Sequence, residues 1–427
     1  MRTLLLGVGI FTFSTAVHMT AGHWLNDASP LDTYSEAGRV ALSLASSGSF
    51  SDPFPTLSTG PTAYVAPAYP YLVSRLILLF GVSHTAWWAI RLLTIAASAS
   101  QWALLPWLAR SWRLPHRAGV IGALVGAVLP IPGNSFKWEA VFVGLLFVIL
   151  AGLTGLLATQ ERHPYLWAIA GALWGVGLLF SPVLLFPWFA SVALLALWLR
   201  HTILWPNLLL LLLLPLCVIT PWTIRNYKIF HHVLLIRNNL GFMLGSSNND
   251  CATGWGWGDR SPACPGLENP YQNLKAAERF AREGEYQFNK EYLNAALAWI
   301  RQRPQRFLWL TLARIRYFWI PPLTYMESRL AVINSLAIAG LTLLSFPGLY
   351  FIFVKQRRAG MFLTATMLLY PAIYYVNQQE LRYRYPILWL TVFAAAITVN
   401  ELAKTVSRRA GKEVGLAGQI KRMPASK

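Results

Sequence analysis

Four carboxylates lie close together near the start of a chain that is otherwise poor in acids. Asp27, Asp32, Glu36 and Asp52 are among only 17 acidic residues, against 36 lysines and arginines. A helix that included Asp32 and Glu36 would place them one turn apart on the same side. Two such carboxylates can activate a hydroxyl nucleophile, one as general base and the other as a positioning group. Asp32 and Glu36 are therefore the candidate catalytic residues.

The same stretch also has a purely structural interpretation. The run TYSE (33–36) fits a capping box, and Pro30 lies just upstream, so the pattern predicts a helix over 33–47. The structural and catalytic interpretations are compatible, because a capped helix is a rigid mount for a catalytic group.

Four arginines are candidates for binding a ligand phosphate. Arg225 lies in TPWTIRNYKIF (220–230), and Arg382 and Arg384 lie in QQELRYRYP (378–386). All three fall at predicted outer boundaries of apolar segments, against the usual bias of basic residues to the cytoplasmic side. Guanidinium groups form paired hydrogen bonds with phosphate, and the alternative is that they extend toward lipid phosphates. Arg91 lies within or beside an apolar segment, where an ionisable group indicates function, and the alternative is that it marks a helix end.

The composition requires lipid as part of the solvent. The chain has 427 residues, of which 55% are hydrophobic and only 12% charged, whereas about a quarter of the residues in a soluble domain are charged. The net charge of +19 comes from clusters between apolar runs, such as KQRR (355–358), which is typical of a cytoplasmic membrane face. We therefore expect anionic membrane lipid, and not nucleic acid, as a partner.

The apolar segments predict an all-α polytopic membrane protein. About ten transmembrane helices are expected, within a range of about nine to twelve, since each needs roughly 20 apolar residues. Counting membrane crossings forward from the N-terminus and backward from the C-terminus places the interval 223–328 on opposite sides of the membrane. The proline-interrupted pair 165–199 is the segment expected not to cross fully. The apolar segments are 3–22, 64–81, 86–108, 118–133, 140–159, 165–181, 183–199, 203–222, 330–354, 360–376 and 386–403.

The order of these segments predicts four regions. Residues 1–222 form an N-terminal transmembrane catalytic bundle with an acidic external loop at 23–63. Residues 223–328 form an external loop whose helices, rich in Arg, Tyr and Trp, lie in the membrane interface. Residues 329–403 hold the last transmembrane helices, and 404–427 form a basic cytoplasmic tail.

The sequence lacks the motifs typical of metal binding, nucleotide binding and serine hydrolases. The histidines and cysteines show no metal-ligand spacing, and there is no P-loop, GxSxG motif or dinucleotide fingerprint. We therefore expect neither a metal nor a cofactor. Cys251 and Cys264 share one polar loop and would form a disulfide if that loop is extracytoplasmic, the alternative being that both remain thiols. Cys217 lies in an apolar run.

Six stretches, taken in order, resemble the bacterial membrane glycosyltransferases of family 39, relatives of protein O-mannosyltransferases and lipid A aminoarabinose transferases. They are LDTYSEAGRVAL, which contains Asp32, and APAYPYL, AIRLL, PWTIRNY, WIRQRPQRF and ELRYRYP. The resemblance covers the chain up to about residue 403, and PWTIRNY followed by an outer loop is its most specific part. It implies the GT-C fold.

The resemblance also implies an activity: an inverting transfer of a sugar from a polyprenyl-phosphate-linked donor to a protein, lipid or polysaccharide acceptor. The site would face the extracytoplasmic side of a bacterial inner membrane. Asp32 would be the base, with Glu36 near the place where the family often has an adjacent acidic pair. Arg225, Arg382, Arg384 and Arg91 would lie near the donor phosphate. Arginine would stabilise the departing phosphate, so that no metal is needed.

Two other classes of protein fit parts of the sequence. A transporter or flippase for a lipid-linked or anionic substrate also needs charged groups in the membrane, but it predicts paired halves with broken helices, which the sequence lacks. A non-catalytic partner in envelope assembly would use Asp32 only at a helix start.

Overall fold

The chain is helical throughout the part that is described. The computed structural model describes residues 2–24, 35–130, 138–159, 163–201, 205–256, 269–325 and 329–420, with side chains from residue 5 to 20 in the first helix and up to 407 in the last. Within these residues the β pairing is limited to one isolated bridge between Ser51 and Pro61. The predicted all-α class is confirmed.

The helices fall into an N-terminal bundle, a peripheral arm and a C-terminal group. The bundle contains α1 (Arg2–Trp24), α2 (Glu36–Ser47), α3 (Ala68–Phe80), α4 (His84–Ala103), α5 (Leu105–Ser111), α6 (His116–Val128), α7 (Ala140–Thr159), α8 (Pro164–Phe180), η2 (Pro182–Leu184), α9 (Leu185–Leu199) and α10 (Trp205–Phe230). The arm contains α11 (Leu240–Ser247), α12 (Leu274–Glu283), α13 (Glu285–Gln302), α14 (Pro304–Trp319) and η4 (Leu323–Tyr325). The C-terminal group contains α15 (Arg329–Lys355), α16 (Arg357–Leu369), α17 (Ala372–Val376) and α18 (Leu381–Ile420).

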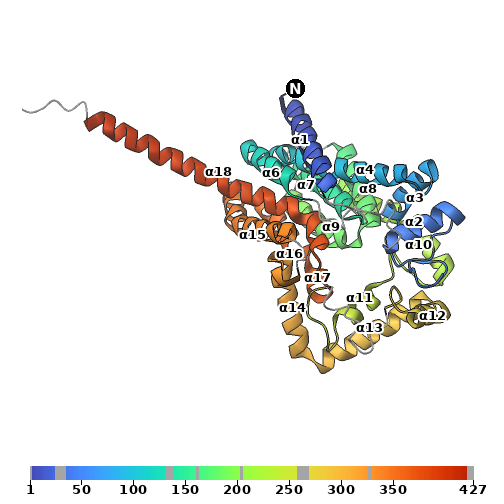
Figure 1. Ribbon diagram of the computed structural model, residues 1–427. Helices are drawn as coiled ribbons and strands as arrows, with labels where there is room; N and C mark the ends of the chain where they lie inside the picture. The colour runs from blue at the N-terminus through green and yellow to red at the C-terminus, as the bar shows by residue number, and fades with distance from the viewer. Residues whose placement is uncertain are drawn as a thin grey trace, which may run out of the picture.

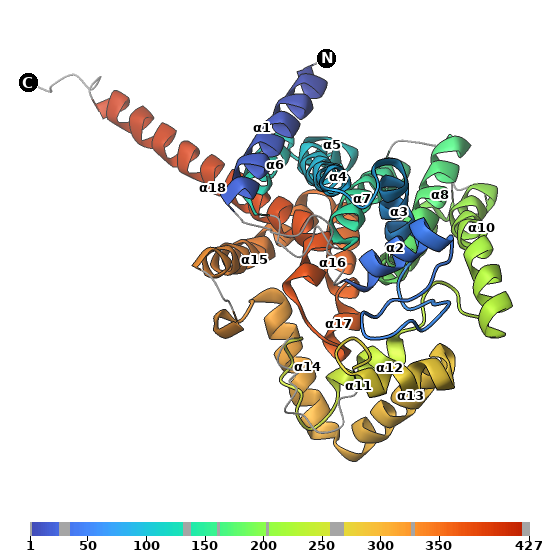
Figure 2. The same ribbon diagram turned by 45° about the vertical axis from the view of Figure 1, so that its right-hand side comes forward.

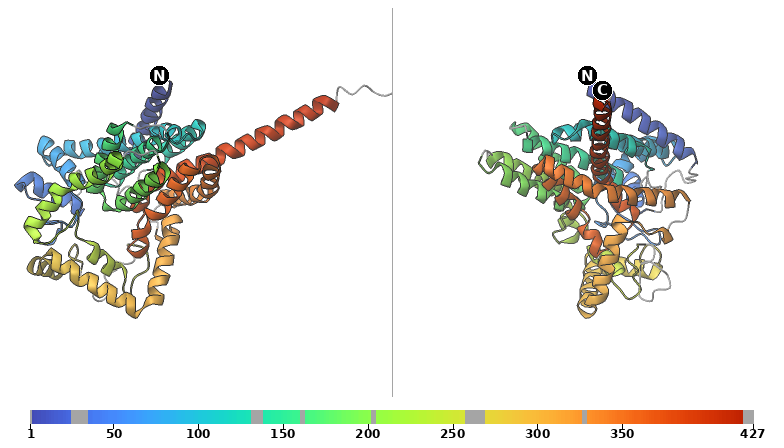
Figure 3. Two further views of the ribbon diagram at one scale, coloured as in Figure 1. Left: turned by 180° about the vertical axis from the view of Figure 1, so that it is seen from behind. Right: turned by 90° about the vertical axis from the view of Figure 1, so that its left-hand side faces the viewer.

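The arm lies to one side of the bundle (Figures 1 and 2). Seen from behind, α13 and α14 form an angled layer, and α18 extends beyond the bundle away from it (Figure 3). Helix α10 continues to Phe230, past the predicted boundary at 222, and α18 continues helically through the predicted tail to Ile420.

Helix α7 measures the thickness of the bundle. Its 20 residues extend about 30 Å, which matches the hydrocarbon core of a membrane. We call the face at which α7 begins, at Ala140, the loop face, because α2 and the arm are on that side. We call the face at which it ends, at Thr159, the basic face, because Arg113, Arg200 and Arg357 surround that end.

Eleven apolar helical segments in the described part of the chain are candidates to cross a membrane. Seven are long and apolar enough to span it, and the shorter apolar helices α1, α3, α6 and α8 pack beside them. This agrees with the predicted figure of about ten. Apolar side chains point outward from these helices, for example Leu213 on α10 and Leu343 and Phe346 on α15, which are more than half exposed. Lipid would cover them.

The proline-interrupted pair 165–199 runs between the two faces as α8 and α9, so the prediction that it does not cross fully was wrong. At the loop face the α8 end stacks Phe180 on Phe142, with ring centres 5.9 Å apart. At the basic face the α9 end packs Trp198 against Trp112, so both helices of the pair cross. Helix α3 has only 13 residues, or about 20 Å, and its start packs Tyr69 on Phe142 at the loop face.

Helix α2 begins later than predicted. Its N-cap is Ser35, whose hydroxyl accepts a hydrogen bond from the Gly38 N–H at 3.0 Å, so Glu36 is the first helical residue. The capping box with Thr33 as N-cap and the helix start at 33 were therefore wrong. The apolar face of α2 (Ala37, Val40) packs against α3.

Glycines let large indole rings enter the helix interfaces. A Cβ on Gly126 of α6 would overlap the ring of Trp102, and one on Gly152 of α7 would overlap the ring of Trp107. Close packing of this kind drives helix association in lipid, where hydrophobic exclusion from water is absent.

Of the cysteines, Cys251 is disulfide-bonded and Cys217 is free. Cys264, the predicted partner, lies outside the described residues.

The contact between α15 and α18 depends on Gly348. A Cβ there would lie 2.6 Å from the backbone carbon of Ala394 and closer still to its oxygen. We expect Gly348→Ala to lower the stability of the purified protein by about 1–3 kcal/mol through overpacking. Gly340→Ala is the matched control on the same helix, because a Cβ there meets no atom within 4 Å and alanine favours helix. Thermal unfolding in detergent would measure both, and equal melting temperatures for the two variants would contradict the prediction.

Candidate active site

Arg382, one of the predicted phosphate-binding residues, is the centre of a charged site at the loop face. Its Nε lies 2.8 Å from Oε2 of Glu380, and the two side chains are 13% and 10% exposed. The guanidinium lies 4.1 Å from the ring centre of Trp138 and 5.0 Å from that of Tyr383. Aromatic faces on two sides and a carboxylate beside it fix the orientation of this cation.

A group of tyrosines continues the site away from Arg382. Tyr383 accepts a hydrogen bond from Arg382 at 3.2 Å and one from Gln378 at 2.6 Å. Its ring stacks on Tyr374 at 4.5 Å, and Tyr374 in turn contacts Tyr370. The site therefore combines one cation with phenolic rings and hydroxyls.

Glu36, one of the predicted catalytic residues, lies near this site. Its carboxylate acts electrostatically on Arg382, together with that of Glu380. Helix α2 thus brings the residue that follows the acidic segment to the start of α18. Asp32, the predicted base, and Asp27 lie outside the described residues.

Three site residues were not predicted. Trp138 supplies the ring beneath Arg382, and Glu139 acts electrostatically on Tyr370 and Tyr374. Arg237 donates from Nε to the Tyr64 carbonyl at 3.3 Å and also acts on Tyr374. Glu139 does stand at the start of an apolar segment, which could have indicated it, but nothing around Arg237 in the sequence indicates its neighbours.

Arg384 does not face the same site as Arg382. Two residues apart on a helix, their side chains point about 200° apart. Arg384 is fully buried and donates to the Phe318 carbonyl at 2.8 Å and to the hydroxyls of Thr342 and Thr391 at 2.9 and 3.0 Å. It therefore joins α14, α15 and α18.

Arg225 binds the backbone of the first loop. It donates to the carbonyls of Thr62 and Phe50 at 2.6 and 2.9 Å, and its guanidinium lies 4.7 Å from the ring centre of Trp222. Arg91 is buried on α4 against the rings of Trp87 and Trp88, at 4.9 and 5.4 Å. Neither arginine is among the groups that the structure places around Arg382.

Glu285 at the start of α13 binds the same loop from the other side, and the sequence did not reveal it. Its carboxyl oxygens accept hydrogen bonds from the Thr62 hydroxyl at 2.5 Å and from the Ala63 N–H at 3.1 Å. Burial raises its pKa to about 7, although these hydrogen bonds and the nearby Arg225 oppose the shift. The buried loop backbone thereby gains partners for its polar groups.

Asp52 has a structural role within the loop. Its carboxylate accepts hydrogen bonds from the N–H groups of Thr59 and Gly60 and from the hydroxyls of Ser51 and Ser58. Partial burial raises its pKa, but the hydrogen bonds outweigh that effect and hold the pKa below its ordinary value. These contacts stabilise a turn in which Asp52 itself has a positive φ of 59°.

Arg314 of α14 connects the arm to the site. Fully buried, it donates to the side-chain oxygen of Asn248 at 3.0 Å, to the Val376 carbonyl at 3.3 Å and to the Ser247 carbonyl. The Gly256 N–H donates to the Gln379 carbonyl at 2.9 Å. The loop 248–256 thus packs against the segment that carries Glu380 and Arg382.

The described residues contain no group of three or more His, Cys, Asp or Glu side chains that could hold a metal ion. That finding does not extend to Asp32.

Comparison with known proteins shows a similar fold among solved structures, but it does not show a family. No family model matches the chain, and no curated protein matches it. Among solved structures, the chain is similar to an oligosaccharyltransferase of Archaeoglobus fulgidus in complex with zinc and sulfate, with a TM-score of 0.54 and 13% identity. The match covers 96% of this chain and 51% of that one.

Two further structures of the same archaeal enzyme agree. The apo form matches with a TM-score of 0.54 and 13% identity over 97% of this chain and 52% of that one. The form tethered to an acceptor peptide matches with a TM-score of 0.50 and 15% identity over 95% and 50%. The chain thus spans about half the length of this enzyme, and at such identity the likeness concerns the fold alone.

Glu285 predicts pH-dependent stability. Its pKa of about 7 in the folded protein exceeds its ordinary value of 4.5, so the folded state binds this proton more tightly than the unfolded chain does. Its contribution to stability is complete below about pH 4.5 and is lost as the pH rises through about 7. We expect unfolding in detergent to show a decline between about pH 5 and 8 that is weaker in Glu285→Gln. Glu278→Gln, an exposed control on α12, should keep the wild-type slope. A Glu285→Gln slope equal to the wild type would contradict this assignment.

Proposed function

We propose that this protein is an inverting glycosyltransferase that moves a sugar from a polyprenyl-phosphate-linked donor to an acceptor hydroxyl. The observation that carries the proposal is the site at the loop face where Arg382 is held against Glu380 and the ring of Trp138. Glu36, from near the other end of the chain, is close enough to act on Arg382 electrostatically. The fold shared with an oligosaccharyltransferase supports the same class of reaction.

The proposed chemistry needs one base and one stabilised leaving group. Asp32 takes the proton of the acceptor hydroxyl as its oxygen bonds to the anomeric carbon. The bond from that carbon to the phosphate oxygen breaks, and polyprenyl phosphate departs as an anion. Attack opposite the leaving group inverts the anomeric centre. Glu36 has a positioning role, since it lies at the first turn of a capped helix directly after the segment that holds Asp32.

Arg382 is the proposed donor-phosphate residue. Its guanidinium is held by rings and by Glu380, and it is mostly shielded from water, where a fixed positive charge stabilises a developing anion most strongly. Arg237 adds a second positive charge next to the tyrosines. Arg225, Arg384 and Arg91 support this site through the loop and the helices that they contact, and direct phosphate binding by them remains a prediction.

We propose further that the loop face is extracytoplasmic and that the membrane is a bacterial inner membrane. The basic face carries Arg113, Arg200, Arg357 and Arg358, and short basic loops mark the cytoplasmic side. The family 39 resemblance of the sequence supports this assignment. The acceptor would then be a protein, lipid or polysaccharide outside the cytoplasm.

The base is tested by Asp32→Asn. We expect release of free polyprenyl phosphate from polyprenyl-phospho-sugars to fall at least about 100-fold, because general base catalysis contributes that much or more. Glu278→Gln, far from the site on the exposed side of α12, is the matched control and should retain wild-type release. Equal release by Asp32→Asn and the wild type, with matching melting temperatures, would remove Asp32 from catalysis and favour a transporter or an assembly partner.

The two neighbouring arginines predict different losses. Arg382→Gln should lower the turnover of the folded protein by about 100- to 1000-fold, as when one group that stabilises a transition-state anion is removed. Arg384→Gln should instead lower the melting temperature, because the carbonyl of Phe318 and two threonine hydroxyls lose a buried donor. Assays of donor turnover and thermal unfolding on both variants would check this. The reverse pattern would place Arg384, and not Arg382, at the donor phosphate.

A further inference from the structure

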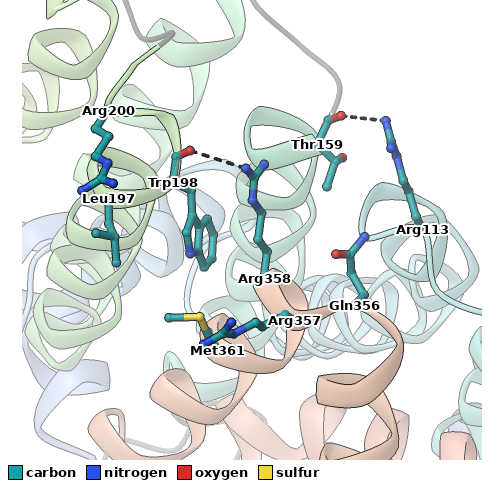
Figure 4. A pocket seen from close by; sticks show the side chains of 9 residues that line it. All are labelled: Arg113, Thr159, Leu197, Trp198, Arg200, Gln356, Arg357, Arg358 and Met361. Atoms are coloured by element: carbon teal, nitrogen blue, oxygen red, sulfur yellow. Dashed lines mark hydrogen bonds between the residues drawn. The ribbon is translucent and has the colours of Figure 1, made fainter.

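A cavity of about 760 Å³ opens on the basic face, at the opposite end of α7 from the candidate active site (Figure 4). Four arginines line it, namely Arg113, Arg200, Arg357 and Arg358, and none of its described lining residues is acidic. They come from the segment after α5, the end of α9 and the start of α16. Four guanidinium groups around one cavity form a concentrated positive field.

Two of these arginines are held in place by the ends of α7 and α9. Arg113 donates to the Thr159 carbonyl at 2.7 Å, and Arg358 donates to the Ala158 carbonyl at 2.6 Å and to the Trp198 carbonyl at 3.4 Å. Such terminal carbonyls lack partners within their helix. Each guanidinium has five N–H donors, so both keep donors for a ligand after these bonds are made.

Arg113 adopts a backbone conformation that a long side chain rarely takes. Its φ is 55°, in the left-handed region that costs a non-glycine residue about 1 kcal/mol or more. That conformation places its guanidinium at the edge of the cavity, against the end of α7 (Figure 4). The strain is consistent with a functional position.

The other two arginines are open to the cavity. Within the described part of the chain, neither Arg200 nor Arg357 has a hydrogen-bond or ion-pair partner among side chains or backbone, and both are exposed. Arg357 is also the first residue of α16, a helix of 13 residues whose N-cap, Gln356, makes no side-chain capping bond. The unbonded N–H groups of that first turn add to the attraction for an anion. Glu161, the acid nearest in sequence, lies outside the described residues.

The cavity also has an apolar side. Leu197, Trp198 and Met361 line it beside the arginines, and it lies at the ends of helices that cross the bundle. Tryptophan is typical of the depth at which lipid headgroups meet hydrocarbon. Basic groups above an apolar wall at this depth match a phospholipid, with its phosphate on the guanidinium groups and its glycerol and chains beside Trp198.

We infer that this cavity binds the phosphate of an anionic phospholipid headgroup. Arg200, Arg357 and the start of α16 supply the contacts that are open, and Arg113 and Arg358 add fixed charge. Basic pockets between membrane helices on a cytoplasmic side bind such headgroups. The site is separated from Arg382 by the length of α7, about 30 Å, so the bound lipid is not the reacting donor and the inference is independent of the proposed reaction.

The test is native mass spectrometry of the full chain in detergent, with dioleoylphosphatidylglycerol and dioleoylphosphatidylcholine as separate probes. We expect one phosphatidylglycerol per chain to bind more tightly than phosphatidylcholine. The double variant Arg200→Gln/Arg357→Gln should raise the Kd for phosphatidylglycerol at least tenfold. The control Arg117→Gln/Lys404→Gln removes the same charge from exposed positions near this face outside the cavity lining, and its Kd should change less than about twofold.

Several outcomes would overturn the inference. Equal weakening in both double variants would mean that lipid responds to general surface charge and not to this cavity. Phosphatidylglycerol bound no more tightly than phosphatidylcholine would exclude a headgroup phosphate site. A third probe, inorganic pyrophosphate, tests the source of the phosphate. If it displaces phosphatidylglycerol at equal concentration and its own binding is lost only in Arg200→Gln/Arg357→Gln, the ligand is a soluble anion and not a lipid.

Discussion

The constraint on which the rest of the structure depends is the burial of the loop backbone at Phe50 and at Thr62 and Ala63. These peptide groups are shielded from water, so charged side chains bind them. Arg225 takes the carbonyls of Phe50 and Thr62, and Glu285 takes the N–H of Ala63. A positive group from α10 and a negative group from α13 therefore hold one short stretch from two sides. Removing either would leave buried polar groups without partners.

This arrangement explains how residues from opposite ends of the chain come to one site. Phe50 packs on Trp222 of α10 in a cluster that also contains Val40 and Leu44 of α2, and α2 brings Glu36 near Arg382. Arg384, two residues along the same helix, faces the other way and joins α14 to α15 and α18. The start of α18 therefore carries both a candidate active-site residue and a residue that holds helices together, because side chains two residues apart on a helix point to nearly opposite sides.

The two membrane faces divide the charged groups between them. At the loop face, charges are paired, buried and surrounded by aromatic rings, so they are oriented for specific contacts. At the basic face, four arginines surround a cavity whose described lining has no acid. A site that must stabilise a transient anion benefits from shielding, whereas a site for a resident anionic headgroup can remain open to the interface.

The sequence by itself determined that the protein lies in lipid, and it indicated which charged residues are candidates for the site. The scarcity of charge required lipid, the apolar runs predicted about ten crossings, and the catalytic role of Glu36 and the phosphate-binding role of Arg382 stay predictions. Tertiary structure decided that the proline-interrupted pair α8 and α9 runs between both faces, because Phe180 and Trp198 meet aromatic partners near opposite ends of α7. It also decided that Arg225 and Arg384 bind backbone and hydroxyl groups, and it revealed Glu285. The sequence shows which hydrogen-bond donors a side chain has. Only the fold shows which acceptors, from distant parts of the chain, lie close enough to bind them.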